Sequence, residues 1–103
     1  MTDDDKKRLT EWLGERYSKG LVGYPYKHEG IICSNRTFTT PDDMMEVFHK
    51  LVEIDKWANF KWHENTVRQW DLDETNLVYS DWLFYNPTRF CQLAADFLKE
   101  NKP

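Results

Sequence analysis

The sequence predicts an α+β fold, in which two or three helices pack against a small antiparallel sheet of about three strands. Two helices have clear starts, one at Thr40 and Pro41 and the other at Asn86 and Pro87. In each, a polar side chain caps the first turn, and proline takes the first helical position, where a missing N–H does no harm. Between them, apolar and polar side chains alternate through a tryptophan-rich stretch, residues 57–84, which favours half-buried strands.

The composition is typical of one globular domain, which we expect to cover residues 1–103. Of these residues, 40% are hydrophobic and 16% are aromatic, enough for a compact core and unlike a disordered chain. The formal net charge is −4. We therefore expect neither nucleic acid nor an anionic membrane as a partner, because both favour basic protein surfaces.

The cysteine content and the N-terminal residues indicate a cytoplasmic protein. Cys33 and Cys91 are too few for a disulfide framework, and free thiols are typical of a reducing compartment. The first residues are acidic and lack the apolar run of a signal peptide. No apolar run approaches the ~20 residues that a membrane-spanning helix needs.

The first expected element is a helix at residues 3–13. Three aspartates open it, where negative charge is favourable, and Leu9, Trp12 and Leu13 fall on one face. Gly14 ends it, because glycine readily adopts the left-handed conformation that follows many helices.

Residues 15–38 follow no regular period, since glycine and proline interrupt them repeatedly. Within them, residues 31–33 fit either a short strand or an apolar plug. A long irregular loop in a small domain is often functional. The alternative is a covering flap whose tyrosines close the core.

Two amphipathic helices frame the second half of the chain. The helix expected at residues 41–55 places Met44, Phe48 and Leu51 on one side. The last helix, at residues 87–99, has the most regular apolar face. That face consists of Phe90, Leu93, Ala94, Phe97 and Leu98.

Three strands are expected between these helices, at residues 58–62, 66–70 and 77–84. Each shows apolar and polar side chains in alternation. Short polar turns join them, so we expect antiparallel pairing, because parallel neighbours need a crossover of about a dozen residues or more.

The sequence predicts neither a metal site, nor a cofactor, nor an active site. Its histidines and cysteines lie on different elements, without C-x-x-C or H-x-x-x-H spacing. Residues 71–76 begin like a calcium loop, but Asn76 stands where glycine is required and Trp82 where the bidentate glutamate belongs. Nucleophile, phosphate-loop and zinc-protease motifs are missing, so we expect a protein that is not an enzyme.

An acidic run and surplus aromatic side chains are the candidate contact surface. Residues 71–81 carry four carboxylates and no lysine or arginine, which fits either a solvated turn or a site for a basic partner. Three of the five tryptophans are assigned to the core, whereas two lie beside polar turns and are expected to be exposed. Exposed tryptophan and tyrosine are enriched at binding hot spots. The candidate contact residues are Tyr24, Tyr26, Trp57, Trp70, Asp71, Asp73 and Glu74.

Several segments follow one another in a familiar order. A helix ends at residues 13–14, residues 39–47 open the next helix, and residues 60–62 and Trp82 supply tryptophan segments before the face at residues 90–95. This order, over residues 8–100, resembles the phage ABA-sandwich domain proteins, small proteins of phages and prophages. The resemblance implies an α+β sandwich and a viral or prophage origin, and it brings no established activity and no catalytic residues.

The sequence therefore favours an acidic phage or prophage accessory protein that acts by binding another protein, of the host or of the phage, such as a defence factor. A phage-encoded chain would act in the host cytoplasm. The alternative is a protein that binds or sequesters a small molecule or nucleotide. In that case Tyr17, Tyr24 and Tyr26, with a tryptophan, would stack on the ring of the ligand.

Overall fold

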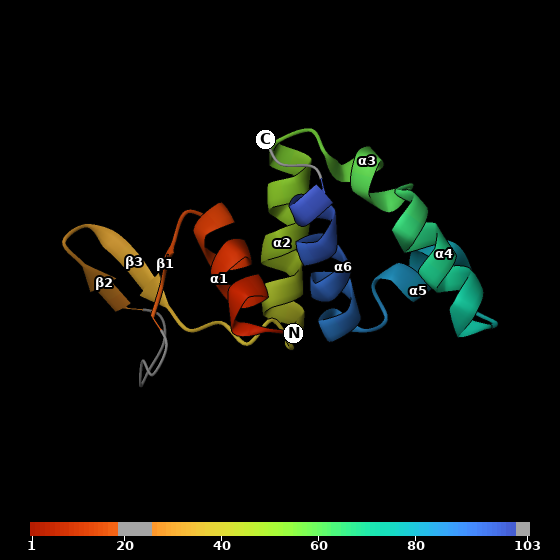
Figure 1. Ribbon diagram of the computed structural model, residues 1–103, viewed down its shortest axis with the longest axis horizontal. Helices are drawn as coiled ribbons and strands as arrows, with labels where there is room; N and C mark the ends of the chain where they lie inside the picture. The colour runs from red at the N-terminus through yellow and green to blue at the C-terminus, as the bar shows by residue number, and fades with distance from the viewer. Residues whose placement is uncertain (19–25, 101–103) are drawn as a thin grey trace.

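The computed structural model describes residues 1–18 and 26–100, and most of these residues are helical. The helices are α1 (Asp3–Trp12), α2 (Pro41–Glu53), α3 (Trp57–Lys61), α4 (Glu64–Asp73), α5 (Tyr79–Leu83) and α6 (Pro87–Glu100). The strands are β1 (Arg16–Tyr17), β2 (Tyr26–His28) and β3 (Ile31–Ser34). The molecule is elongated, 45 × 26 × 20 Å, with α1, α2 and α6 side by side in its middle (Figure 1). The strands lie at one end, and α3, α4 and α5 lie at the other.

The three helices expected at residues 3–13, 41–55 and 87–99 are confirmed as α1, α2 and α6. Each begins with a polar cap that accepts a hydrogen bond from a backbone N–H three residues later. The acceptors are Thr2 (3.1 Å to Asp5 N), Thr40 (3.2 Å to Asp43 N) and Asn86 (3.1 Å to Arg89 N). These caps satisfy N–H groups that have no partner inside the helix. Because such capping residues are strongly preferred at helix starts, the starts could be predicted from the sequence.

The predicted antiparallel sheet at residues 58–62, 66–70 and 77–84 is wrong, and with it the sandwich of helices and sheet. These residues form the short helices α3, α4 and α5 instead. Alternation over about five residues does not distinguish a strand from one or two helical turns. Packing decided the outcome, because β propensity is strongly dependent on context.

The buried residues of α3 and α4 show the helical period that the sequence pattern concealed. Phe60 is fully buried and lies three residues after the half-buried Trp57. Thr66 is buried and lies four residues before the half-buried Trp70. His63 starts α4, where its Nδ1 accepts a hydrogen bond from the Asn65 N–H at 3.3 Å.

The strands of the described residues form in the stretch that was predicted to be irregular. The order is β1-β3-β2, with β1 parallel to β3 and β2 antiparallel to it, so this small sheet is mixed. Glu29 and Gly30 join β2 to β3 with φ of 51° and 81°, the backbone of a tight hairpin turn. Residues 31–33 therefore belong to a strand, and Ile31 and Ile32 are exposed instead of plugging the core.

The core is centred on α6, which packs mainly against α2 and also against α1 and α4. Half of its fourteen residues are buried: Phe90, Cys91, Leu93, Ala94, Ala95, Phe97 and Leu98. Other elements add Leu9, Phe38, Met44, Val47, Leu51, Phe60, Trp82 and Leu83. Every helix contributes to this one cluster or borders it. Because α6 lies at its centre and contacts helices toward both ends, it joins the two ends of the molecule.

A buried ion cluster attaches the sheet to the start of α2. Arg36 donates two hydrogen bonds of 2.8 Å to the carboxylate of Glu15 and one of 2.7 Å to Asp43. The Asp43 carboxylate also accepts the Phe38 N–H at 3.1 Å. Burial disfavours ionised Glu15, but the hydrogen bonds and the charge of Arg36 outweigh burial and lower the pKa of Glu15. We call these three charged residues the Arg36 junction.

Candidate functional site

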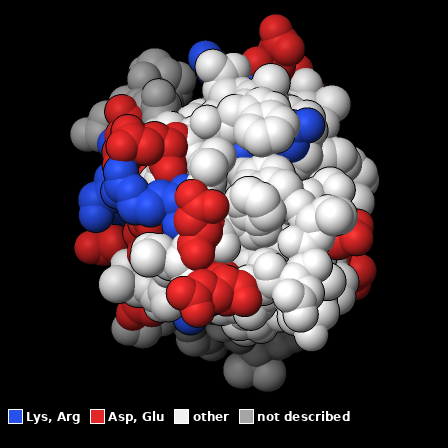
Figure 2. Space-filling model, turned by 90° about the vertical axis from the view of Figure 1, so that its right-hand side faces the viewer, with Lys and Arg blue, Asp and Glu red and all other residues white. Residues whose placement is uncertain are grey.

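The most exposed apolar side chains gather at the end of the molecule formed by residues 57–86, which we call the aromatic end. Among the described residues, nine large apolar side chains are exposed. The four most exposed all belong to this end: Trp62 (63%), Leu72 (68%), Val78 (61%) and Tyr85 (75%). Seen from this side, the surface is broad and mostly uncharged, with carboxylates and some basic side chains toward its margins (Figure 2).

Stacked rings make this surface rigid. The Trp62 ring lies nearly parallel to Tyr79, with 5.1 Å between centroids and 10° between planes. Tyr79 in turn stacks on Trp82 at 5.8 Å and meets the Trp70 ring edge-on at 5.3 Å. The Tyr79 hydroxyl donates to the Lys61 carbonyl, and burial raises the pKa of Tyr79 to about 12, so the phenol stays neutral. The exposed indole thus rests on a fixed support.

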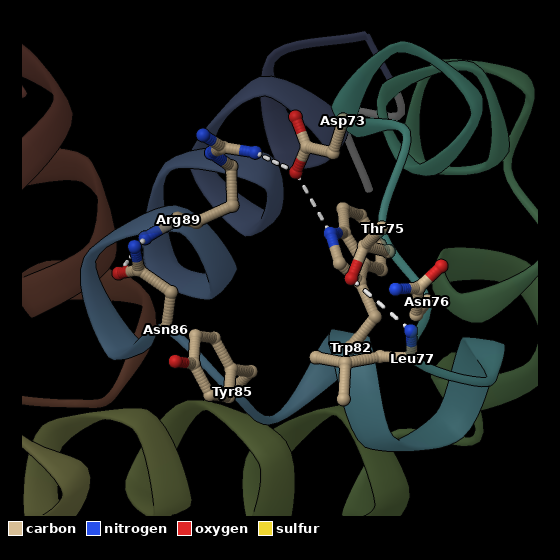
Figure 3. Close-up of a pocket in the computed structure, with 8 residues that line it drawn as sticks. All are labelled: Asp73, Thr75, Asn76, Leu77, Trp82, Tyr85, Asn86 and Arg89. Atoms are coloured by element: carbon tan, nitrogen blue, oxygen red, sulfur yellow. Dashed lines mark hydrogen bonds and ion pairs between the residues drawn. The ribbon is translucent and has the colours of Figure 1, made fainter.

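A pocket of about 450 Å³ opens beside this stack, between the end of α4 and the start of α6 (Figure 3). Its lining residues are Asp73, Thr75, Asn76, Leu77, Trp82, Tyr85, Asn86 and Arg89. Trp82 belongs both to the stack and to the pocket, so the two features are continuous. The volume falls within the roughly 300–1,000 Å³ of typical ligand pockets.

Asp73 organises the pocket. Its Oδ2 accepts hydrogen bonds from Trp82 Nε1 at 2.7 Å and from the Arg89 guanidinium, and its Oδ1 accepts one from Gln69 at 3.0 Å. Burial opposes ionisation of Asp73, but these hydrogen bonds and the charge of Arg89 lower its pKa below the ordinary value. Asp73 is therefore ionised at neutral pH and fixes the side chains of Trp82 and Arg89.

Several polar groups of the pocket remain available to a ligand. Within the described ranges, the side-chain amide of Asn76, the Asn86 NH₂ group and the Tyr85 hydroxyl have no hydrogen-bond partner. Asn86 uses only its oxygen, to cap α6. The Asp73–Arg89 pair balances the charge of the lining, so the pocket offers apolar surface and neutral hydrogen-bonding groups.

The C-terminal end of α4 carries an unusual concentration of negative charge. Asp71 and Glu74 are exposed there beside Asp73, and the last turn contains no basic residue. Carboxylates are unfavourable at this end of a helix, because its carbonyl groups already give it partial negative charge. Glu74 also takes the left-handed conformation, with φ of 47°. Arg89 reaches across from α6 to Asp73, which relieves part of this imbalance.

The structure brings some of the predicted contact residues together and separates others. Asp71, Asp73 and Glu74 share the end of α4, and Trp70 is half-buried nearby, with its Nε1 donating to Leu77 O at 3.4 Å. Trp57 is half-buried and faces the core. Its ring lies 4.7 Å from Phe48, 5.7 Å from Phe84 and 6.3 Å from Phe90. Tyr24, together with the side chain of Tyr26, lies outside the described residues.

Sequence reasoning missed Trp62, Tyr85 and Arg89. Trp62 was assigned to a strand of the core, and only the helical geometry of α3 turns it outward. Arg89 is the third residue of the capped helix that begins at Pro87, so its place near the start of α6 was predictable. Its contact with Asp73, across 16 residues, was not.

The described residues contain no group of three or more His, Cys, Asp or Glu side chains placed to hold a metal ion. Cys91 is buried, and burial together with the charge of Asp43 raises the pKa of its thiol to about 12, so the thiolate is not populated near neutral pH. Over the same residues, every helix is too short or too polar to cross a membrane.

Comparisons with protein-family models, curated proteins and solved structures returned no match to this chain. The resemblance to the phage ABA-sandwich proteins thus stays a prediction, and the sandwich fold that it implied is not the fold observed. The candidate site stands on its own geometry.

Proposed function

We propose that this protein is a non-catalytic protein-binding module whose contact surface is the aromatic end. One observation carries this proposal. The four most exposed apolar side chains of the described residues, Trp62, Leu72, Val78 and Tyr85, come from one 24-residue stretch. Exposed apolar surface gathered in one place is typical of interaction sites, whereas single exposed apolar residues are ordinary.

The rigidity of the surface supports the same function. Tryptophan and tyrosine are the residues most often found at binding hot spots, and ordering them before binding reduces the entropy lost on association. Trp62 is held on Tyr79, and Trp82 is held by Asp73. A phage or prophage origin, with a host or defence factor as the partner, rests on the family resemblance of the sequence alone.

A comparative capture experiment tests the proposal. The tagged chain, the double variant Trp62→Ala/Tyr85→Ala and the control Val52→Ala/Ile54→Ala are each incubated with lysate of the natural host cell. The control residues are exposed apolar side chains at the end of α2. We expect a protein that the wild type and the control retain and the double variant loses, and the affinity is then measured with purified components. Equal retention by all three would assign binding to another surface.

The pocket favours a second candidate function, binding of a small molecule. Its lining combines the rings of Trp82 and Tyr85 with the free amides of Asn76 and Asn86, as a planar, polar ligand requires. A thermal-shift screen with nucleotides and related compounds tests it, because a ligand at 100 times its Kd adds about 2.7 kcal/mol to stability. A shift that Asn86→Ala abolishes would favour this function over the first.

A further inference from the structure

We propose that the aromatic end accepts a basic segment of the partner protein, one that carries apolar side chains between lysines or arginines. This inference rests on the proposed function and names the chemistry of the partner. Two independent features of the surface support it. The exposed rings favour apolar contacts, and the negative charges around them favour a partner segment of positive charge.

The charge balance of the aromatic end is strongly negative. Residues 57–86 contain five carboxylates and only two lysine or arginine side chains. One of these cations, Arg68, is bound to Glu64 of the same helix. Asp71, Glu74 and Asp81 are exposed and have no ion pair among the described residues. A partner with lysine or arginine at these places would supply the missing counter-charges.

The need for positive counter-charges is concentrated at the C-terminal end of α4. Asp71, Asp73 and Glu74 stand where the carbonyl groups of the helix are already negative, and among the described residues Arg89 is the one cation from another element that pairs with any of them. Natural sequences usually place basic residues there. This departure from the usual charge pattern lies next to exposed aromatic rings. Such a departure is expected where a binding partner supplies the missing basic residues.

The exposed indole adds a second attraction for cations. The Lys61 ammonium lies 5.3 Å from the centroid of Trp62 and 5.8 Å from that of Trp57. A partner's ammonium group could take this place over the ring by the same electrostatic interaction if the Lys61 side chain turned aside. Apolar side chains of the partner would meet Leu72 and Val78 and enter the pocket beside Tyr85.

The same charges disfavour the other occupants. A second copy of this chain would bring its own carboxylates against this surface, and a nucleic acid would bring phosphates. Both contacts place like charges together, which costs affinity. The experiment below includes an acidic probe, because tight binding of that probe would favour such occupants.

Two synthetic helical peptides of opposite charge test the inference. One carries leucine and lysine in amphipathic order, and the other has glutamate in place of every lysine. Binding is followed through the indole N–H signal of Trp62, which is identified by its absence from Trp62→Phe. The protein variants are Asp71→Asn/Glu74→Gln/Asp81→Asn and, as a control with the same change in net charge, Asp4→Asn/Glu46→Gln/Glu53→Gln on α1 and α2. All six positions are exposed, and circular dichroism checks folding.

We expect the lysine peptide to shift the Trp62 signal and the glutamate peptide to leave it unchanged. The Kd of the lysine peptide should rise about tenfold in the first variant and less than about threefold in the control. Equal weakening in both variants would reduce the effect to net charge and overturn the inference. So would equal binding of both peptides, or no shift with either.

The capture experiment above separates this inference from the proposed function. Loss of capture in Trp62→Ala/Tyr85→Ala, together with failure of the lysine peptide, would leave a protein-binding surface of different specificity. Failure in both experiments would remove the surface as a binding site.

Discussion

Two arginines in this protein each bind an aspartate from another element, and the two contacts have opposite surroundings. Arg36 binds Asp43 and Glu15 in the interior, where its side chain is 9% exposed. Arg89 binds Asp73 at the rim of a pocket, where its side chain is 38% exposed. The first contact attaches the sheet to α2, and the second closes one side of the candidate site.

The difference separates a contact that holds the fold from one that shapes a surface. Buried charges lose their hydration and must be matched by partners, as they are in the Arg36 junction, where four hydrogen bonds join Arg36, Glu15, Asp43 and the Phe38 N–H. Exposed charges stay hydrated and stabilise the fold little, so their arrangement is free to serve binding. We expect substitutions at the two places to separate stability from recognition.

The largest expected effect is at the Arg36 junction. Arg36→Met leaves Glu15 and Asp43 buried without their cation and should lower the free energy of unfolding by about 3–5 kcal/mol. Arg89→Met should cost about 1 kcal/mol or less, because its pair is partly hydrated. Urea denaturation followed by circular dichroism measures both. Equal losses of unfolding free energy would show that the two contacts stabilise the fold to the same extent.

Next in size is the loss of the indole donor of Trp82. Trp82→Phe keeps a large ring but removes the hydrogen bond to ionised Asp73, which should cost about 1.5–3 kcal/mol. Trp70→Phe is the matched control, because the hydrogen bond that its indole donates goes to a neutral carbonyl, at 3.4 Å. We expect about 1 kcal/mol or less for that control in the same denaturation assay. If Trp70→Phe lowered the free energy of unfolding as much as Trp82→Phe does, the hydrogen bond to Asp73 would contribute no more than a bond to a neutral carbonyl.

Acid should weaken both the Arg36 junction and the contact between Asp73 and Arg89. Glu15 and Asp73 have pKa values lowered by folding, so their stabilisation is complete above the ordinary values of 4.5 and 3.8 and is lost as pH falls through the folded-state values. Unfolding free energies measured between pH 2 and 6 should therefore fall less steeply toward acid in Glu15→Gln than in wild type. Asp73→Asn should flatten the slope as well. A steeper slope in either variant would contradict the claim that the ionised carboxylate stabilises the fold.

The smallest expected effect on stability is at the exposed end of the ring stack. Trp62→Ala removes one stacking partner from Tyr79 and little buried area, so it should change the free energy of unfolding by about 1 kcal/mol or less. Phe60→Ala, two residues earlier and fully buried, should cost about 3–5 kcal/mol. A large loss in Trp62→Ala would assign this indole to the fold instead of to binding.

The acidic part of the candidate site was predictable from sequence, and the aromatic part was not. Asp71, Asp73 and Glu74 are neighbours in the chain, so any backbone conformation keeps them close. Trp62 and Tyr79 are seventeen positions apart, and their stacking depends on how α3 and α5 pack. Treating residues 58–62 as a strand placed Trp62 in the interior, the reverse of its observed position.

The sequence by itself determined where α1, α2 and α6 begin and which face of α6 is buried. These features depend on caps within three residues and on a repeat of 3.6 residues, both of which act over short distances along the chain. Only the tertiary structure decided that residues 57–83 form helices, that the strands of the described residues form a mixed sheet before α2, and that Arg89 meets Asp73. Those outcomes depend on contacts between distant segments, whose burial outweighs the weak local preference of short alternating runs.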